Sequence, residues 1–239
     1  MFRPQFALAV LVFVTFYAEA ALYDRGNGLI YDSVLNITWL QDANYAKTSQ
    51  YDNEGDLSWS EAKAWAGGLE YGGYDDWRLP SARLVNPANP CYDYDGSCDS
   101  GFNNTISELG HMFYNNLENP GYEDIDGFYQ PSGLENWHFL DGDDGSSVSF
   151  SNFTSNHWVY WFEEEFAPNT KMAWVFDTRM GYQRQHEKNT EHLQLPGLGH
   201  YAWAVRTGDV ITSAPLPASM LFFVSALLSL MAPNRRRDN

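Results

Sequence analysis

Two apolar segments, one near each end of the 239-residue chain, restrict the folding unit to the residues between them. The first is an apolar run over 6–16 that follows Arg3 and precedes Ala18-Glu19-Ala20. A basic residue, an apolar run and a small-x-small sequence, in that order, are typical of a cleaved secretory signal peptide. We therefore expect residues 1–20 to direct export and one folded domain to occupy residues 21–212.

The second apolar segment occupies residues 220–232. Pro215-Leu216-Pro217-Ala218 precedes it, and Arg235, Arg236 and Arg237 follow it. Residues 219–232 would form a helix of roughly 21 Å, whereas the apolar core of a bilayer is about 30 Å thick. Proline at 215 and 217 disfavours a longer regular helix. A transient anchor with its arginines on the cytoplasmic side therefore fits better than a permanent membrane span.

These three parts resemble the PEP-CTERM class of bacterial sorting signals, in the variant with Pro-Leu-Pro-Ala. The resemblance makes residues 213–239 a sorting segment with its motif at 215–219. It implies transient processing by an exosortase-type enzyme and export linked to extracellular polysaccharide. It places the processed protein at the outer surface or in the extracellular matrix. The alternative is an ordinary C-terminal anchor that keeps the protein in the inner membrane, facing the periplasm.

Charge excludes some partners for the domain between the signals. Four of the 14 Lys and Arg residues and two of the 31 Asp and Glu residues lie in the two end segments, so the domain carries a net charge of −19. Such a chain repels nucleic acid and anionic lipid, so we expect no nucleic-acid partner and membrane contact only through the C-terminal segment. The negative charge also disfavours the binding of sulfated or uronic polymers, unless cations bridge the protein and the polymer. Solubility outside the cell is the alternative reason for the charge.

The patterns within residues 21–212 predict a single α+β domain. A capping box at Ser58 and Glu61 begins one helix, and Thr105 and Glu108 fit a second capping box. Alternating apolar residues predict strands on both sides of the helices. We expect two helices packed on a mostly antiparallel sheet, with long irregular loops. The expected strands are 28–32, 34–40, 157–162, 171–177 and 200–206, and the expected helices are 58–69 and the residues after 105.

Several motifs in the domain occur in a familiar order. They include Asp76-Trp77-Arg78-Leu79-Pro80-Ser81 and Ala202-Trp203-Ala204-Val205-Arg206. Together they resemble the C-terminal domain family of the Legionella collagen-like adhesin, over about 180 residues of this chain. The resemblance implies a fold related to C-type lectins and formylglycine-generating enzymes, and a non-enzymatic surface module that binds glycans. It also implies a structural role for Trp77, Arg78, Leu79, Pro80 and Arg206. The collagen-like stalk is missing, so trimerisation is not carried over.

The only two cysteines are Cys91 and Cys98. Export makes a disulfide the default for such a pair. A redox-active pair is the alternative, although the spacing is not Cys-x-x-Cys.

Two acidic loops are candidate calcium sites. Calcium prefers six to eight oxygen ligands from a flexible loop. Neither loop is an EF-hand, and a solvated acidic turn is the alternative at both. The candidate ligands are Asp93, Asp95 and Asp99 in the first loop and Asp141, Asp143 and Asp144 in the second.

Aromatic side chains are the candidates for stacking on a sugar. Trp158, Tyr160 and Trp161 alternate between the two faces of a predicted strand, so one face must be exposed or covered. Core packing is the alternative for two of the three. Tyr182, in a polar stretch that we expect to be a loop, is the fourth candidate.

No catalytic constellation is evident in the sequence. Glu163-Glu164-Glu165 and Asp75-Asp76 provide neighbouring carboxylates, but glycosidases need two carboxylates across a cleft, which sequence neighbours do not establish. The six histidines form no zinc signature. We therefore expect no enzymatic activity and no cofactor other than calcium. A purely structural matrix protein is the second interpretation, and an enzyme acting on polysaccharide is the third.

Overall fold

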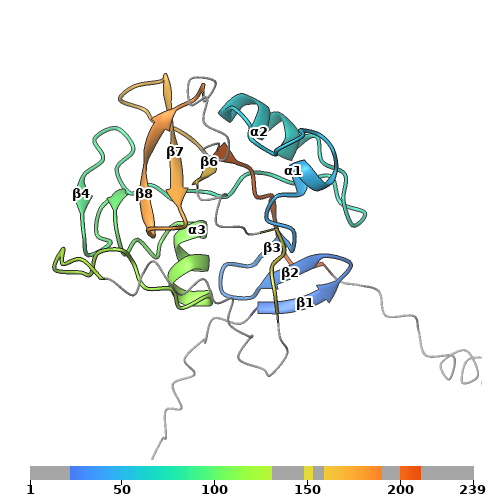
Figure 1. The fold of residues 1–239 in the computed structure, drawn as a ribbon, viewed down its shortest axis with the longest axis horizontal. Coiled ribbons are helices and arrows are strands. Elements are labelled where there is room, and N and C mark those ends of the chain that lie inside the picture. Colours follow the sequence, from blue (N-terminus) through green and yellow to red (C-terminus); the bar gives the residue numbers. More distant parts are fainter. Residues whose placement is uncertain (1–21, 131–147, 153–158, 190–199, 211–239) are drawn as a thin grey trace, which may run out of the picture.

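The fold is built on two β-sheets that the last described stretch of chain connects (Figure 1). The computed structural model describes residues 22–130, 148–152, 159–189 and 200–210. The strands are β1 (Leu22–Gly26), β2 (Leu29–Asp32), β3 (Ile37–Leu40), β4 (Tyr92–Asp93), β5 (Ser100–Gly101), β6 (Val159–Glu165), β7 (Met172–Asp177), β8 (Tyr182–Glu187), β9 (His200–Tyr201) and β10 (Val205–Thr207). The helices are α1 (Tyr45–Thr48), α2 (Trp59–Gly67) and α3 (Glu108–His111), which continues into the π-helical turn η1 (Met112–Asn116).

The first sheet has four antiparallel strands in the order β1-β2-β3-β10. A tight turn with positive φ angles at Gly26, Asn27 and Gly28 connects β1 to β2. The Asp32 carboxylate ends β2, because it accepts the backbone N–H groups of the next turn. All four residues of β3 are buried, as expected for a strand covered on both faces.

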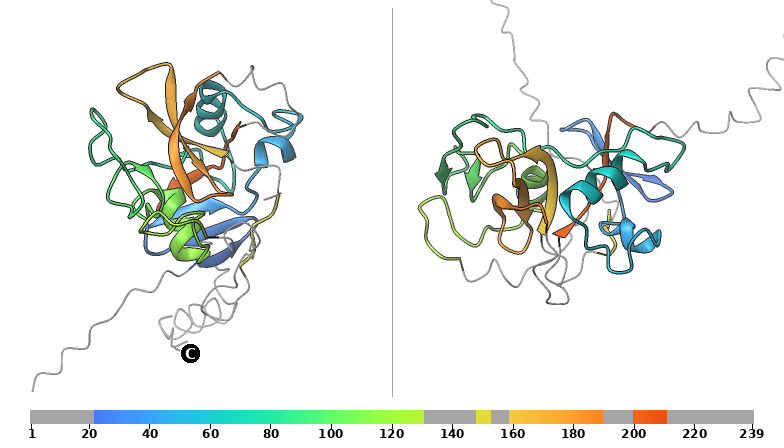
Figure 2. Two further views of the ribbon diagram at one scale, coloured as in Figure 1. Left: turned by 60° about the vertical axis from the view of Figure 1, so that its left-hand side comes forward. Right: turned by 90° about the horizontal axis from the view of Figure 1, so that it is seen from above.

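The second sheet has six strands in the order β4-β5-β8-β7-β6-β9. The pairs β4–β5 and β6–β9 are parallel, and the other pairs are antiparallel. Helix α2 packs on β6, where the indole N–H of Trp59 donates to the carbonyl of Phe162 at 2.9 Å. Seen from above, β1–β3 and α2 lie on one side of the molecule, and β7, β8 and the loop with β4 lie on the other (Figure 2).

The segment predicted as one strand over 200–206 is two strands in different sheets. β9 pairs with β6, and β10 pairs with β3. The residues between them are buried, and the indole N–H of Trp203 donates to the carbonyl of Leu40 at 2.7 Å. The ring of Trp203 lies 4.7 Å from that of Trp39 and 4.9 Å from that of Phe150. The core of the domain therefore lies where the chain passes from one sheet to the other.

The first predicted helix start is confirmed, and the second is wrong. Ser58 and Glu61 form the capping box of α2. In α3 the cap is Ser107, whose hydroxyl accepts the N–H of Gly110 at 3.0 Å, and not Thr105. The turn before α3 is held by Asn104 and not by Thr105, because the side-chain oxygen of Asn104 accepts the backbone N–H groups of Ile106 and Ser107.

The structure is a mixed α+β fold, as predicted, with more strand than the sequence indicated. The N-terminal strand β1 and the polar strand β8 were not expected. Within the described residues, no helix has the length and apolar composition needed to cross a membrane. The two end segments, including Pro215-Leu216-Pro217-Ala218 and the three terminal arginines, lie outside the described residues.

Candidate functional site

The disulfide closes the loop that carries the first candidate site. Cys91 and Cys98 are bonded to one another, as the sequence predicted. The two short strands of this loop, β4 and β5, pair in parallel, and β5 joins β8. The loop is therefore held at the edge of the six-stranded sheet.

The three aspartates of this loop support its backbone. Asp99 is buried, and its carboxylate accepts the N–H groups of Val85 and Asn86 at 2.5 and 2.9 Å. Asp93 and Asp95 each accept a backbone N–H from within the loop. Hydrogen bonds from Ser97 lower the pKa of Asp95, so this exposed carboxylate is ionised at neutral pH.

The calcium sites stay a prediction. In the part of the chain that the structure describes, no three acidic, histidine or cysteine side chains are grouped so that they could hold a metal ion. Asp141, Asp143 and Asp144 lie outside the described residues.

Four aromatic side chains pack together on the disulfide loop. The ring of Phe102 lies between those of Tyr94 and Tyr182, with centroids 6.2 and 4.7 Å away and nearly parallel planes. The ring of Tyr92 meets both tyrosines edge-on. Burial is the main cause that raises the pKa of Tyr92 and of Tyr182, so both hydroxyls are protonated at neutral pH. Tyr182 begins β8 and does not lie in a loop as predicted.

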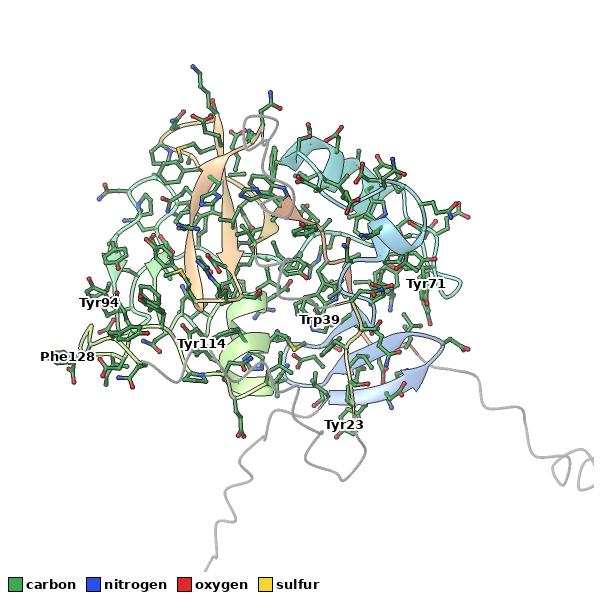
Figure 3. All side chains as sticks on the ribbon, in the orientation of Figure 1. Tyr23, Trp39, Tyr71, Tyr94, Tyr114 and Phe128 are labelled. Carbon is green, nitrogen blue, oxygen red and sulfur yellow. A yellow bond between two sulfur atoms is a disulfide. The ribbon has the colours of Figure 1, made fainter. Side chains whose placement is uncertain are left out.

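A tight turn brings further apolar side chains beside this cluster. The Asp124 carboxylate accepts two backbone N–H groups of the turn, at 3.0 and 2.9 Å. Gly127 allows close contact, because a Cβ there would lie 3.1 Å from the ring of Tyr94. Ile125 and Phe128 are 65% and 68% exposed. We call this surface the aromatic end of the molecule, and Tyr94 and Phe128 mark it in Figure 3. Its residues are Tyr92, Tyr94, Ile125, Phe128 and Tyr129.

One asparagine joins the loop to the turn. The side-chain amide of Asn103 donates to the carbonyls of Tyr94 at 2.7 Å and Glu123 at 3.1 Å. The backbone N–H of Asn103 donates to the hydroxyl of Tyr114, which itself donates to the carbonyl of Gly181. The aromatic end is thus fixed by a disulfide, a sheet edge and a hydrogen-bonded turn.

Two of the predicted sugar-stacking residues belong to the core instead. Tyr160 and Trp161 are fully buried, and the indole N–H of Trp161 donates to the carbonyl of Leu57 at 2.8 Å. Residues pointing to both faces of this strand are buried, so the core-packing alternative holds for these two side chains. Neither ring can therefore stack on a ligand in this structure. Trp158 lies outside the described residues.

The Trp77-Arg78-Leu79-Pro80 segment makes the contacts of a structural element. Trp77, Leu79 and Pro80 are buried. The guanidinium group of Arg78 donates to both carboxylate oxygens of Glu108, at 2.8 and 2.9 Å, and to the carbonyl of Leu79 at 3.0 Å. This fork links the segment to the start of α3.

Three of the five neighbouring carboxylates considered for catalysis make hydrogen bonds or ion pairs within the fold. Arg206 donates to both oxygens of Asp76, at 2.7 and 3.0 Å, and these hydrogen bonds lower the pKa of Asp76. Glu164 accepts the hydroxyl of Ser81 at 2.6 Å and a backbone N–H at 2.9 Å. Glu165 pairs with Lys188.

A hollow of about 230 Å3 lies at the other end of the view in Figure 3, beside the labelled Tyr71. Asp42 is one of its polar lining residues, and the Asp42 carboxylate accepts the N–H of Asn44 at 2.9 Å and the side-chain amide of Asn152 at 2.7 Å. Its aromatic walls are the rings of Tyr45 and Tyr71, which meet edge-to-face at 5.0 Å. The lining residues are Gly28, Leu40, Gln41, Asp42, Tyr45, Thr48, Tyr71 and Ser151.

A two-glycine turn sets the position of Tyr71. Its backbone exchanges hydrogen bonds with that of Tyr74 at 3.0 Å across Gly72-Gly73, where φ is +64° and +85°. Two consecutive positive φ angles are those of a type I′ turn. The hydroxyl of Tyr71 donates to the carbonyl of Asn27 at 2.9 Å and lies directly over Gly28. The wall of the hollow is therefore rigid.

A pair of histidines lies on the six-stranded sheet, with His200 buried and His186 partly exposed. A ring nitrogen of His186 in β8 is hydrogen-bonded to one of His200 in β9. The ring of Trp161 stacks on His200 at 4.5 Å. Burial, with the positive charge of Arg184, lowers the pKa of His186 to about 4. Burial, with the neighbouring His186 and Arg184, lowers that of His200 to about 3. Both imidazoles are therefore neutral at neutral pH.

Comparison with family models, with curated proteins and with solved structures finds no match for this chain. The site must therefore be judged on its own geometry.

The sequence interpretation missed the exposed residues of the aromatic end and all residues of the hollow. A signal for the first was present, since Ile125, Phe128 and Tyr129 are large apolar residues inside a polar turn sequence. A signal for the second was the pair of glycines between Tyr71 and Tyr74, a composition typical of a hairpin turn.

Proposed function

We propose that this protein is an exported, non-enzymatic module that binds polysaccharide through its aromatic end. The observation that carries the proposal is the exposure of Tyr92, Ile125, Phe128 and Tyr129 on a rigid frame. Exposed apolar clusters on a folded domain mark interaction surfaces.

Aromatic rings suit a sugar ligand for a chemical reason. A pyranose ring presents a flat face of C–H groups, which packs on an aromatic face, while its hydroxyls need polar partners at the edge. The protonated hydroxyl of Tyr92 provides such a partner beside the ring faces. A rigid platform also binds with little loss of side-chain freedom, which favours affinity.

Charge narrows the class of polysaccharide. The turn that presents Phe128 also carries Glu123, Asp124 and Asp126, and the whole chain has a net charge of −17. Sulfated and uronic polymers are repelled by such a surface. Neutral or cationic polysaccharides are therefore the proposed ligands, and calcium is proposed only as a bridge to acidic ones.

Export and sorting complete the proposal. A disulfide is typical of proteins outside the cytoplasm. Together with the apolar ends, it supports an exported protein that an exosortase-type enzyme processes and that resides at the outer surface or in the extracellular matrix. We also propose that the α+β fold is a relative of the C-type-lectin fold. Inner-membrane retention facing the periplasm is the alternative location.

Affinity electrophoresis tests the proposed binding. The full-length protein is run through gels containing dextran or hydroxyethyl cellulose, two neutral polysaccharides, and retardation in at least one gel is expected. Replacing Tyr92 and Phe128 together by alanine should weaken binding by about 2 kcal/mol, at about 1 kcal/mol for each stacked ring.

A matched pair of tyrosines provides the control. Tyr129 and Tyr51 are 51% and 52% exposed, but only Tyr129 belongs to the aromatic end. Tyr129→Ala should reduce the retardation, and Tyr51→Ala should leave it unchanged. Equal effects of the two substitutions, or no retardation in any gel, would favour a purely structural matrix protein.

A further inference from the structure

The hollow beside Tyr71 has a different chemistry from the aromatic end. It combines two aromatic walls with an anionic side chain, and it lies in a separate part of the fold. We propose that this hollow binds a single amino-sugar unit with a free ammonium group, and that Asp42 is the counter-ion. The inference rests on the proposed function only for its choice of a sugar ligand.

Size favours one sugar unit. Pockets for drug-sized ligands measure about 300–1,000 Å3, and this hollow measures about 230 Å3. Thr48 and Ser151 are exposed, so the mouth of the hollow opens to solvent beside them. A ligand the size of a hexose can therefore enter without movement of the backbone.

Asp42 supplies the charge that the ligand must complement. The N–H of Asn44 and the amide of Asn152 each donate to a different carboxylate oxygen, which fixes the group and leaves each oxygen able to accept another hydrogen bond. Among the residues that the structure describes, no lysine or arginine forms an ion pair with Asp42. An ammonium group satisfies both conditions, because it donates hydrogen bonds and neutralises the charge.

The remaining walls suit the rest of an amino sugar. The rings of Tyr45 and Tyr71 form a corner with an angle of 75° between their planes. One ring can pack against the C–H face of the sugar while the other attracts the ammonium group through its π-system. The hydroxyl of Thr48 accepts the amide of Asn152 and keeps its own proton to donate to a sugar hydroxyl. Phosphate, sulfate and carboxylate groups are disfavoured by Asp42.

An NMR titration of the full-length, isotope-labelled protein tests this site. Glucosamine should give saturable shifts at the amides of residues 42–48. N-acetylglucosamine and glucose have the same ring but no charge, and they should bind roughly tenfold more weakly. Asp42→Asn should remove the preference for glucosamine. Asp52→Asn is the matched control, because the Asp52 carboxylate also accepts two N–H hydrogen bonds, both from the backbone, but Asp52 does not line the hollow.

A second variant keeps the test decisive if Asp42→Asn fails to fold. Ser151 lines the hollow, and its hydrogen bonds to Gln41 and Ala43 are made by its backbone N–H and carbonyl and not by its side chain. Ser151→Trp should therefore fill the hollow and abolish the shifts without removing the carboxylate. The proposal is overturned if glucosamine gives no saturable shifts, if the neutral sugars bind as tightly, or if either variant binds like the native protein.

Each of the two proposals can be refuted without refuting the other. Loss of gel retardation in the alanine variants of the aromatic end, with the glucosamine shifts intact, supports both sites. Glucosamine binding without any retention by polysaccharide refutes only the role of the aromatic end.

Discussion

Acid should destabilise this protein through a pair of hydrogen-bonded histidines. His186 and His200 have pKa values of about 4 and about 3 in the folded protein, against about 6.5 in an unfolded chain. As the pH falls below 6.5, the unfolded state therefore binds protons before the folded state does. The stability from this pair is fully present above that pH and is lost as the pH falls toward the folded values.

The size of the stability loss follows from the pH interval between the pKa of an unfolded histidine and the pH of the measurement. Between pH 6.5 and pH 5, each fully shifted histidine removes about 2 kcal/mol, at about 1.4 kcal/mol for each pH unit. We take the full effect for His200, which is buried, and about half for His186, which is partly exposed. The expected loss from the pair is therefore about 3 kcal/mol between pH 8 and pH 5.

Urea denaturation followed by tryptophan fluorescence at the two pH values measures this loss. Burial also lowers the pKa of His111 and raises that of Asp56, so these groups add to the pH dependence of stability. A variant with His186→Gln and His200→Gln keeps those groups, so its smaller loss isolates the pair. If the variant loses as much stability as the native protein, the reasoning is refuted.

Three further sets of substitutions test the contacts that hold the fold together, by chemical denaturation at neutral pH. Glu108→Gln should cost about 2 kcal/mol, because the buried carboxylate accepts hydrogen bonds from two arginines, and an unchanged midpoint would contradict that role. Gly28→Ala should lower the free energy of unfolding by roughly 2 kcal/mol more than Gly26→Ala. Both glycines have positive φ, but only at Gly28 would a Cβ lie 2.5 Å from the hydroxyl of Tyr71. Equal losses for the two variants would argue against this contact. Replacing Cys91 and Cys98 by serine should lower the free energy of unfolding by about 2.5 kcal/mol, and a protein that is equally stable with and without reductant would show that the disulfide adds nothing.

Local signals in the sequence predicted local structure well. The Ser58 capping box, a strand at β3 and the cysteine pair were each predicted from residues close in sequence, and each is present. The predicted strand end at Asp32 was also correct, because its carboxylate accepts the N–H groups of the turn that follows β2.

Prediction failed where distant parts of the chain decide the environment. β8 has a polar sequence, yet Gln183 is fully buried because its amide donates to the carbonyl of Asp99 at 2.8 Å. The sequence left open whether Tyr160 and Trp161 are exposed or packed in the core, because only the packing of distant segments on both faces of β6 buries them. The hollow combines residues near 28, 42, 71 and 151, and no local pattern can predict that arrangement.

Because residues 200–207 connect the two sheets, the fold can be completed only after almost the whole domain has been synthesised. β10 pairs with β3, so Thr207 lies opposite Ile37. A chain that emerges from the ribosome with its N-terminus first exposes the edge of β3 until nearly the whole domain has followed. Folding that depends on such distant pairs is slow. The first strands to be synthesised are thus completed by the last, and a domain truncated before Val205 would have an open sheet.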